Sequence, residues 1–176
     1  MISGKARHGK DYIAKLIKGR LQRECNKRVI ILHFADILKS ICKSFYGWDG
    51  TKTETQRQIL IDVAKRYRDM NKDFFAEIVA TIVRDKAKEY DVFIIPDTRY
   101  PNEIEVMKSH SDMDVVTLRI IRPNFDNGLS PSQKSHESEC SLDDYSFDWV
   151  MFNYEKPYDI YTKIEVDDMI AQLITS

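Results

Sequence analysis

Apolar residues fall into two kinds of stretch along this chain of 176 residues. Short apolar runs follow charged or turn-forming segments, which is typical of buried strands. Between them lie longer stretches where apolar residues recur every three or four positions, the spacing of one helix face. The runs that we expect to be strands are Val29–Phe34, Val92–Ile95, Val115–Ile121 and Trp149–Phe152.

The helical spacing predicts a first helix over residues 10–24 and a second from Asp36 to about Tyr46. Thr53 and Asn71 can cap the two helices that follow, because their side-chain oxygens accept bonds from free backbone N–H groups. We expect a short helix from Pro101 to Met107, since proline favours the first turn. The apolar positions of the remaining helices are Ile59, Leu60, Val63 and Tyr67; Phe74, Phe75, Ile78, Val79, Ile82 and Val83; and, in the tail, Tyr161, Ile164, Val166, Met169, Ile170 and Leu173.

Strands that alternate with helices indicate a parallel sheet covered on both faces. The predicted fold class is therefore α/β, a three-layer α/β/α arrangement with a central parallel sheet, as one domain over residues 1–176. Only Met1–Ser3 precede the first glycine, so the first strand is very short or the chain has lost its start. Residues 122–141 are rich in polar and turn-forming residues, which predicts a mobile, lid-like flap or an ordered loop.

Residues Gly4 to Asp11 fit the pattern G-x-x-x-x-G-K, with Asp11 where serine or threonine is usual. Glycines let the backbone wrap closely around a polyphosphate, with N–H groups pointing inward. The following helix directs the positive end of its dipole at the same anion, and Lys10 adds a full charge. A glycine-rich turn with exposed basic residues is the plainer alternative.

Ligands of parallel sheets bind beyond the carboxyl ends of the strands, which selects the residues after each strand. Asp97 follows a buried strand, where phosphate-loop enzymes keep a carboxylate for the magnesium shell. It could equally cap a turn. Arg99 could bind a phosphate with two parallel bonds, or form a surface ion pair of little energy.

Further cations lie on the middle helix and beside the flexible stretch. Arg57 and Arg68 are eleven residues apart, close to three turns, so they share a helix face. They could hold a transferring phosphoryl group, or form only a solvated face. Arg122 could close over the site. We expect His136 to be a hinge or substrate contact, with plain surface loop as the alternative, because its spacing from other ligands is unlike that of a zinc site.

Asp11 offers a carboxylate oxygen, a ligand type that Mg²⁺ prefers, either directly or through water. Its alternative role is to stabilise the helix N-terminus through the dipole.

Composition narrows the class of protein. The net charge is −1, from 27 basic and 28 acidic residues, which gives no field for a nucleic-acid polymer or an anionic membrane. The hydrophobic content of 43% favours a globular fold. The cysteines are three and form no C-x-x-C pair, so we expect neither zinc nor a disulfide framework, and a cytoplasmic location. No apolar run is long enough for a membrane span.

The motifs together resemble the phage-type deoxynucleoside monophosphate kinases. The likeness rests on Gly4–Tyr12, the Phe34–Lys39 segment, Asp97-x-Arg99-Tyr100-x-Asn102-Glu103, the His136-x-Ser138-Glu139 segment and Asn153. Animal-type phosphomevalonate kinase shares the G-K-D loop and the Asp97–Arg99 triplet. It also shares the blocks Glu137–Asp143 and Phe147–Val150. Both groups carry the aspartate at position 11, but Tyr12 stands where the phage enzymes often have threonine.

The resemblance implies a P-loop NTPase fold of nucleoside monophosphate kinase type that transfers a phosphoryl group from ATP, with Mg²⁺, to a small phosphate monoester. We favour a deoxynucleoside monophosphate as acceptor, with phosphomevalonate as the alternative and a non-catalytic nucleotide-binding module as a third hypothesis. If the gene is phage-encoded, the location is the host cytoplasm. A homodimer is left open. The expected catalytic residues are Lys10, Arg57, Arg99 and Arg122. The expected nucleotide contacts are Gly4, Lys5, Ala6, Arg7, His8, Gly9, Lys10, Asp11, Tyr12 and Asn153. The expected acceptor contacts are Asp36, Lys39, Arg57, Arg68, Asp97, Arg99, Asn102, Glu103, His136 and Ser138, and the metal ligands Asp11 and Asp97.

Overall fold

The computed structural model describes residues 1–51, 53–154 and 159–175. Within these residues all strand pairs are parallel. The strands are β1 (Ile2–Ser3), β2 (Val29–Ile31), β3 (Val92–Ile94), β4 (Leu118–Ile121) and β5 (Trp149–Phe152). One group has the order β1-β4-β5 and the other pairs β2 with β3.

The short strand β1 joins these two groups. Ile2 donates its backbone N–H to the carbonyl of Ile95 at 2.7 Å, and the Ile2 carbonyl accepts the N–H of Thr98 at 3.3 Å. On its other side β1 pairs with β4, Ile2 opposite Leu118. The strands therefore follow one another as β2-β3-β1-β4-β5. A first strand of two residues is sufficient because both of its edges are paired.

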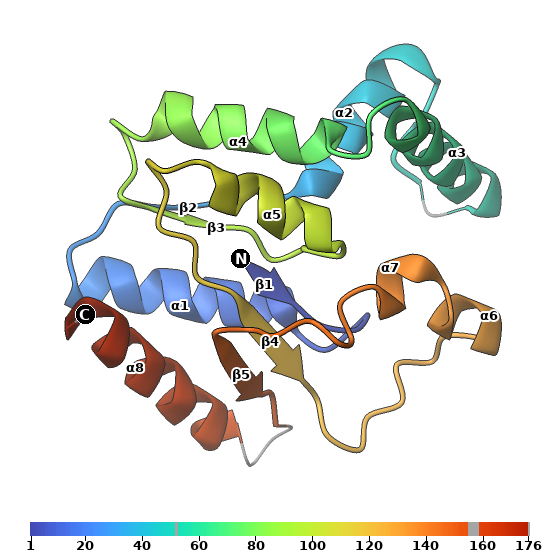
Figure 1. The fold of residues 1–176 in the computed structure, drawn as a ribbon. Helices are drawn as coiled ribbons and strands as arrows, with labels where there is room; N and C mark the ends of the chain where they lie inside the picture. Colours follow the sequence, from blue (N-terminus) through green and yellow to red (C-terminus); the bar gives the residue numbers. More distant parts are fainter. Residues whose placement is uncertain (52, 155–158, 176) are drawn as a thin grey trace.

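Helices lie on both faces of the strands, as the alternating pattern predicts (Figure 1). On one face α1 (Lys10–Glu24) packs with α8 (Asp159–Thr175), and the shared core includes Ile13, Ile120 and Val166. On the other face the core is built from α2 (Phe34–Phe45), α3 (Glu54–Met70), α4 (Phe74–Lys86) and α5 (Pro101–Ser109). The segment between β4 and β5 contains two short helices, α6 (Pro131–Lys134) and α7 (Glu137–Cys140).

The first helix and the cap of α3 are confirmed, since Thr53 Oγ1 accepts the N–H of Gln56 at 3.3 Å. Asn71 was expected to cap α4, but the cap is Asp73, whose N–H donates to the Asn71 side chain. In α4 the residues Phe75, Val79 and Val83 are buried as predicted.

The strands β2, β3 and β4 are shorter than the apolar runs that predict them. Phe34 belongs to α2 because the Asp97 carboxylate accepts the N–H groups of Phe34 and Ala35, which starts that helix two residues early. Before β4, the N–H of Thr117 is taken by the Asp148 carboxylate at 2.7 Å, so the ladder begins at Leu118. In both cases a distant carboxylate, which periodicity does not reveal, sets the boundary.

Candidate phosphate-binding site

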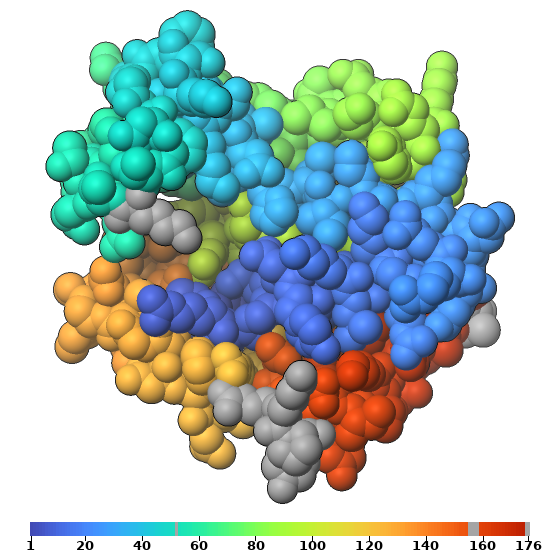
Figure 2. Space-filling model, turned by 180° about the vertical axis from the view of Figure 1, so that it is seen from behind, coloured from blue at the N-terminus to red at the C-terminus, as the bar shows by residue number. Residues whose placement is uncertain are grey.

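The loop between β1 and α1 lies beside a hollow at the carboxyl edge of the strands. Figure 2 shows this loop (dark blue) bordering the hollow between α3 (teal) and residues 122–141 (orange). Next to the loop is a cavity of about 610 Å³, lined by Lys5, His8, Arg119, Asp143, Tyr145 and Phe147 among others. Its lining runs along Arg119–Ile121 of β4 and the residues before β5, so the cavity meets the loop at Lys5 and His8 and extends along the strands rather than beyond their carboxyl ends.

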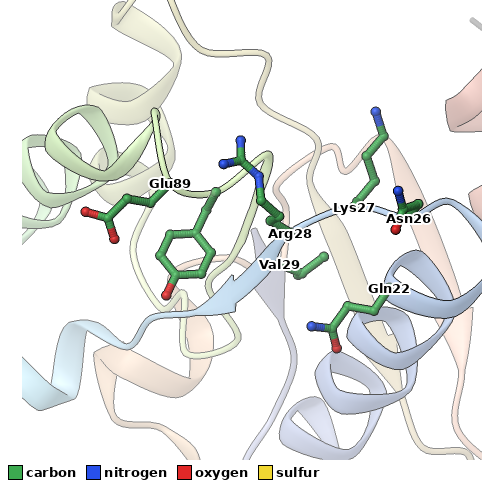
Figure 3. A pocket seen from close by; sticks show the side chains of 7 residues that line it. Gln22, Asn26, Lys27, Arg28, Val29 and Glu89 are labelled. Carbon is green, nitrogen blue, oxygen red and sulfur yellow. The ribbon is translucent and has the colours of Figure 1, made fainter.

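A second cavity, of about 560 Å³, lies away from this edge (Figure 3). Its lining includes Arg28, directly before β2, and Tyr90, two residues before β3, so it opens at the amino ends of these strands. Arg28 is also committed to an ion pair with Asp91 at 2.7 Å. We therefore place the functional site at the opposite edge, around the glycine-rich loop.

Both glycines of the loop are required by its geometry. Gly9 has φ +87°, and a Cβ at this position would lie 2.1 Å from Asn153 Nδ2. Gly4 has φ +155°, and a Cβ there would lie 2.6 Å from the carbonyl oxygen of Ile120. Any larger residue would clash with backbone or with a buried amide, so the loop can lie this close to β4 and β5 only with glycine.

Asn153 fixes the loop from the end of β5. Its Nδ2 donates to the carbonyl of His8 at 2.8 Å, and only 9% of the residue is exposed. The prediction that Asn153 binds nucleotide stays untested, but in the structure its amide is bonded to the loop. His8 Nδ1 in turn accepts the N–H of Arg122 at 3.2 Å, and burial lowers the His8 pKa.

Arg7 and Arg122 connect the loop to the 122–141 segment. Arg7 has φ +61° and donates to the carbonyl of Asn127 at 2.8 Å. The Arg122 guanidinium lies over the ring of Phe125, 3.7 Å from its centroid. Tyr12, one residue into the helix after Asp11, is 43% exposed. The Arg7 and Arg122 contacts attach the loop to the 122–141 segment, whereas Lys10 lies inside the loop.

Lys10 is a buried cation inside the loop. Its Nζ donates to the carbonyl oxygens of Gly4 at 2.9 Å and Lys5 at 3.0 Å, and the residue is 9% exposed. Burial, and next the positive charge of Arg99, lowers the Lys10 pKa to about 8. An ammonium that has lost its water and lies next to another cation is strongly stabilised by an anion.

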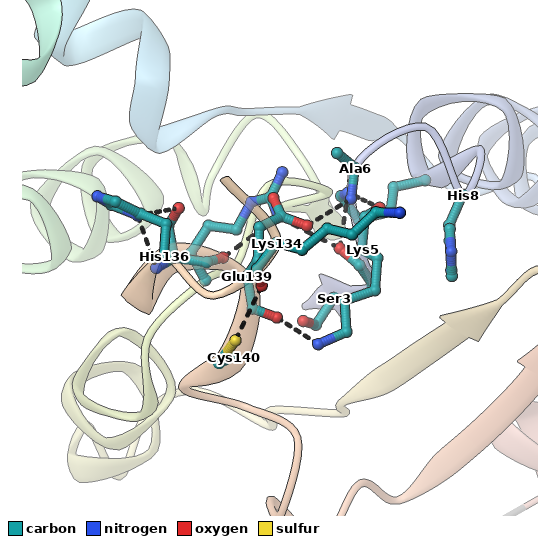
Figure 4. A network of polar contacts seen from close by, with 12 residues as sticks. Ser3, Lys5, Ala6, His8, Lys134, His136, Glu139 and Cys140 are labelled. Carbon is teal, nitrogen blue, oxygen red and sulfur yellow. Dashed lines mark hydrogen bonds and ion pairs between the residues drawn. The ribbon is translucent and has the colours of Figure 1, made fainter. Parts of the chain in front are cut away.

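An anion does lie at this position, and the chain itself supplies it (Figure 4). The Glu139 carboxylate accepts the backbone N–H of Ala6 at 2.8 Å through one oxygen. Its other oxygen accepts Arg99 Nη1 at 2.6 Å, and the side chain is 8% exposed. An amide of the loop and the arginine after β3 therefore converge on one negative group, as the loop motif requires of a phosphate.

A second acidic residue, Asp143, lies just after the 122–141 segment and binds two more cations. Asp143 accepts Lys5 Nζ, and it accepts Arg119 Nη2 at 2.7 Å. Arg119 also donates to Ser3 Oγ at 3.1 Å. Glu139 and Asp143 lie in motifs that carry the family resemblance, but sequence reasoning assigned no site role to them or to Arg119, because only the fold brings these residues to the loop.

The expected metal ligands differ in their availability. Asp97 is largely buried and uses both oxygens to cap α2, and burial raises its pKa. Asp11 is 75% exposed in the first turn of α1, with His33 Nε2 at 3.4 Å. Among residues 1–51, 53–154 and 159–175 no three His, Cys, Asp or Glu residues gather to hold a metal. These carboxylates fit a Mg²⁺ ion that is held mainly by phosphates and water, as is usual for this ion.

The expected acceptor contacts divide between the cleft and the fold. Glu103 is buried and accepts the N–H groups of Arg99 at 2.7 Å and Tyr100 at 3.1 Å, so it positions the Arg99 backbone. Burial raises the Glu103 pKa to about 7. Asn102 Nδ2 donates to the carbonyl of Lys72 at 2.9 Å and ties α5 to the start of α4. Glu103 and Asn102 therefore hold the backbone next to the site through hydrogen bonds of their side chains.

The remaining members lie on helices that border the hollow. Arg68 lies over the Tyr100 ring, 4.7 Å from its centroid, whereas Arg57 is half exposed, with Glu54 at 3.8 Å. Asp36 and Lys39 pair with each other at 3.1 Å at the start of α2. His136 and Ser138 form the cap of α7, with His136 Nδ1 accepting the Ser138 N–H at 3.2 Å. The structure thus joins Lys10, Arg99 and the loop, and does not bring Arg57 into contact with them.

The fold and this loop define an α/β protein with a glycine-rich strand–loop–helix at the carboxyl edge of parallel strands. A family model described as phosphomevalonate kinase matches residues 2–113. The chain belongs to this phosphomevalonate kinase family, and membership supports a phosphotransferase that uses ATP. The match includes the loop and the Asp97–Arg99 triplet, and ends before the Glu137–Val150 block. It favours the alternative that we kept from sequence over the deoxynucleoside monophosphate kinases. In the part of the chain that the structure describes, no helix has the length and apolar character to cross a membrane.

Proposed function

We propose that this protein transfers the terminal phosphoryl group of ATP to the phosphate of phosphomevalonate or a close analogue, giving a diphosphate and ADP. The observation that carries the proposal is the convergence of the Ala6 N–H and the Arg99 guanidinium on one anion beside the buried Lys10. The family match supports the same reaction class. The strand order β2-β3-β1-β4-β5 with the loop after β1 supports a P-loop kinase fold of nucleoside monophosphate kinase type.

In the proposed reaction Lys10 and the loop amides bind the outer phosphates of ATP. Arg99 lies between the donor and acceptor phosphates, where negative charge accumulates during transfer. Mg²⁺ would neutralise the phosphates, with Asp11, and Asp97 through water, as protein ligands. The acceptor oxygen is already ionised, so the chain needs to supply positioning and charge rather than a general base. We retain the proposal of one domain over residues 1–176 whose 122–141 segment acts as a lid that excludes water.

The acceptor side favours a phosphate monoester without a nucleobase. The Tyr100 ring follows Arg99 and is one aromatic surface on which a base could stack. The Arg68 guanidinium already lies 4.7 Å from the centroid of that ring. A stacked cation occupies one face of the ring and adds positive charge next to Arg99. A small anionic acceptor gains from this arrangement more than a base does.

A panel of acceptors tests the proposal. The purified protein is incubated with MgATP and, separately, phosphomevalonate or each nucleoside and deoxynucleoside monophosphate, and ADP release is measured. We expect turnover with phosphomevalonate on the order of 1–100 s⁻¹, the range of kinases, and slower reaction with every nucleotide. A preferred nucleotide acceptor would refute the acceptor assignment. Binding of ATP without acceptor-dependent ADP release would instead favour a nucleotide-binding module.

A further inference from the structure

Helix α7 places a carboxylate where the proposed function requires a phosphate. Glu139 Oε2 is 2.8 Å from the Ala6 nitrogen, and Glu139 Oε1 is 2.6 Å from Arg99 Nη1. The carboxylate is 8% exposed, so the two partners replace most of its water. A backbone amide and a guanidinium are the same donors that bind phosphate oxygens in kinases.

The contact belongs to a wider attachment between the loop and residues 138–143. Arg99 Nη1 also lies 3.3 Å from the carbonyl oxygen of Ser138, and Lys5 Nζ donates to the carbonyl of Glu139 at 2.6 Å. Asp143 accepts Lys5 and Arg119. Lys5, Arg99 and Arg119 are therefore all bonded to one short segment, residues 138–143, at the end of the lid. This segment is a four-residue helix and its flanks, which can move as a unit without unfolding a long element.

A carboxylate and a phosphate cannot accept from the same donors at the same time. Any anion that enters the loop must first separate Glu139 from Ala6 and Arg99. A dianionic or trianionic polyphosphate can also reach Lys10, and so replaces the lost contact with more bonds than it breaks. A single inorganic phosphate reaches fewer donors and gains less.

We propose that Glu139 is an internal competing anion that weakens the binding of every anion to the loop, so that a polyphosphate, which reaches more donors, displaces it where a single phosphate ion does not, and that α7 leaves the loop when a polyphosphate binds. This inference rests on the proposed function, because it requires that the loop bind phosphate. It assigns Glu139 a role before the chemical step, in selecting which anion enters the loop.

Substitution of Glu139 with glutamine tests the proposal, because glutamine keeps the shape and removes the charge. Affinities of the wild type and of Glu139→Gln for pyrophosphate and for inorganic phosphate are measured by calorimetry. We expect pyrophosphate and inorganic phosphate both to bind at least tenfold more tightly to the variant, by similar factors, because the cost of displacing Glu139 is the same for both. Glu137→Gln removes an equal charge from the exposed side of the same helix and serves as control. It should stay within twofold of the wild type.

Hydrogen exchange on the unaltered protein gives a second readout that does not depend on the variant folding. Pyrophosphate should speed exchange of the amides in residues 137–143 of the wild type. The same amides should exchange rapidly in Glu139→Gln without ligand. Equal or weaker pyrophosphate affinity in the variant, or exchange in the wild type that pyrophosphate leaves unchanged, overturns the competing-anion role alone. Failure of the wild type and Glu139→Gln to bind pyrophosphate overturns the phosphate loop itself, and with it the proposed function.

Discussion

Replacement of Gly9 with alanine should distort the loop in a way that can be measured and reversed in part. The residue has φ +87°, a conformation that costs an L-residue roughly 1–2 kcal/mol. The added Cβ would also lie 2.1 Å from Asn153 Nδ2, so the amide must move and lose its 2.8 Å bond to the His8 carbonyl. That bond contributes about 1 kcal/mol. The expected loss of unfolding free energy is therefore about 2–3 kcal/mol.

A double-mutant cycle separates the two causes. Asn153→Ala alone should cost about 1 kcal/mol, since it removes the same bond. In the Gly9→Ala background it should cost little, because the bond is already lost and the clash is relieved. The two changes should therefore be non-additive by about 1 kcal/mol. Urea unfolding followed by tryptophan fluorescence and circular dichroism gives each value.

The chain offers a matched control in α1, the helix that follows the loop. Gly19 lies within α1, and an added Cβ there would meet only the flexible end of Arg23, at 3.2 Å. Gly19→Ala should stabilise the protein, by up to about 1 kcal/mol, through helix propensity. The reasoning fails if Gly9→Ala costs less than about 0.5 kcal/mol, the ordinary effect of a surface substitution. Additivity of Gly9→Ala and Asn153→Ala within about 0.3 kcal/mol would also refute it.

The other predictions concern the charged groups. Lys10→Met should lower turnover on the order of 100- to 1,000-fold, as expected for a group that stabilises transition-state charge. Thermal unfolding should show that the variant is folded. The control variant Lys15→Met, on the exposed face of α1, should remain active. ATP affinity should fall above about pH 8, by up to tenfold per pH unit. Burial lowers the Lys10 pKa to about 8, so above this pH the free protein loses the ammonium charge that binds the phosphates. An ATP affinity that does not change with pH in calorimetry would contradict this role. Burial raises the Glu103 pKa to about 7, so the folded state binds the Glu103 proton more tightly than the unfolded state does. The resulting stabilisation of the folded state is complete below about pH 4.5 and is lost as pH rises through 7. Glu103→Gln keeps the acceptor and cannot titrate, so the difference in unfolding free energy between variant and wild type should shift by about 3 kcal/mol between pH 4.5 and 8; a constant difference in urea titrations would show that Glu103 does not titrate in this range.

Local sequence was sufficient for features whose causes are local. The first helix begins at Lys10 and ends at Glu24 as the spacing predicts, and Thr53 caps α3 through a residue three positions away. The loop pattern also predicted the need for glycine at positions 4 and 9. In each case the hydrogen bonds or steric limits act within a few residues, where a pattern along the chain can register them.

The sequence by itself thus determined the alternation of strands and helices, the glycine loop and Lys10. Only the tertiary structure decided where β2 ends and where β4 begins, because Asp97 and Asp148 take backbone N–H groups from 62 and 31 residues away. It also decided which anion fills the loop, since Glu139 lies 133 residues from Ala6. A carboxylate can take part in such a contact from any position in the chain, and nothing in its neighbouring residues indicates which donors it will meet after folding.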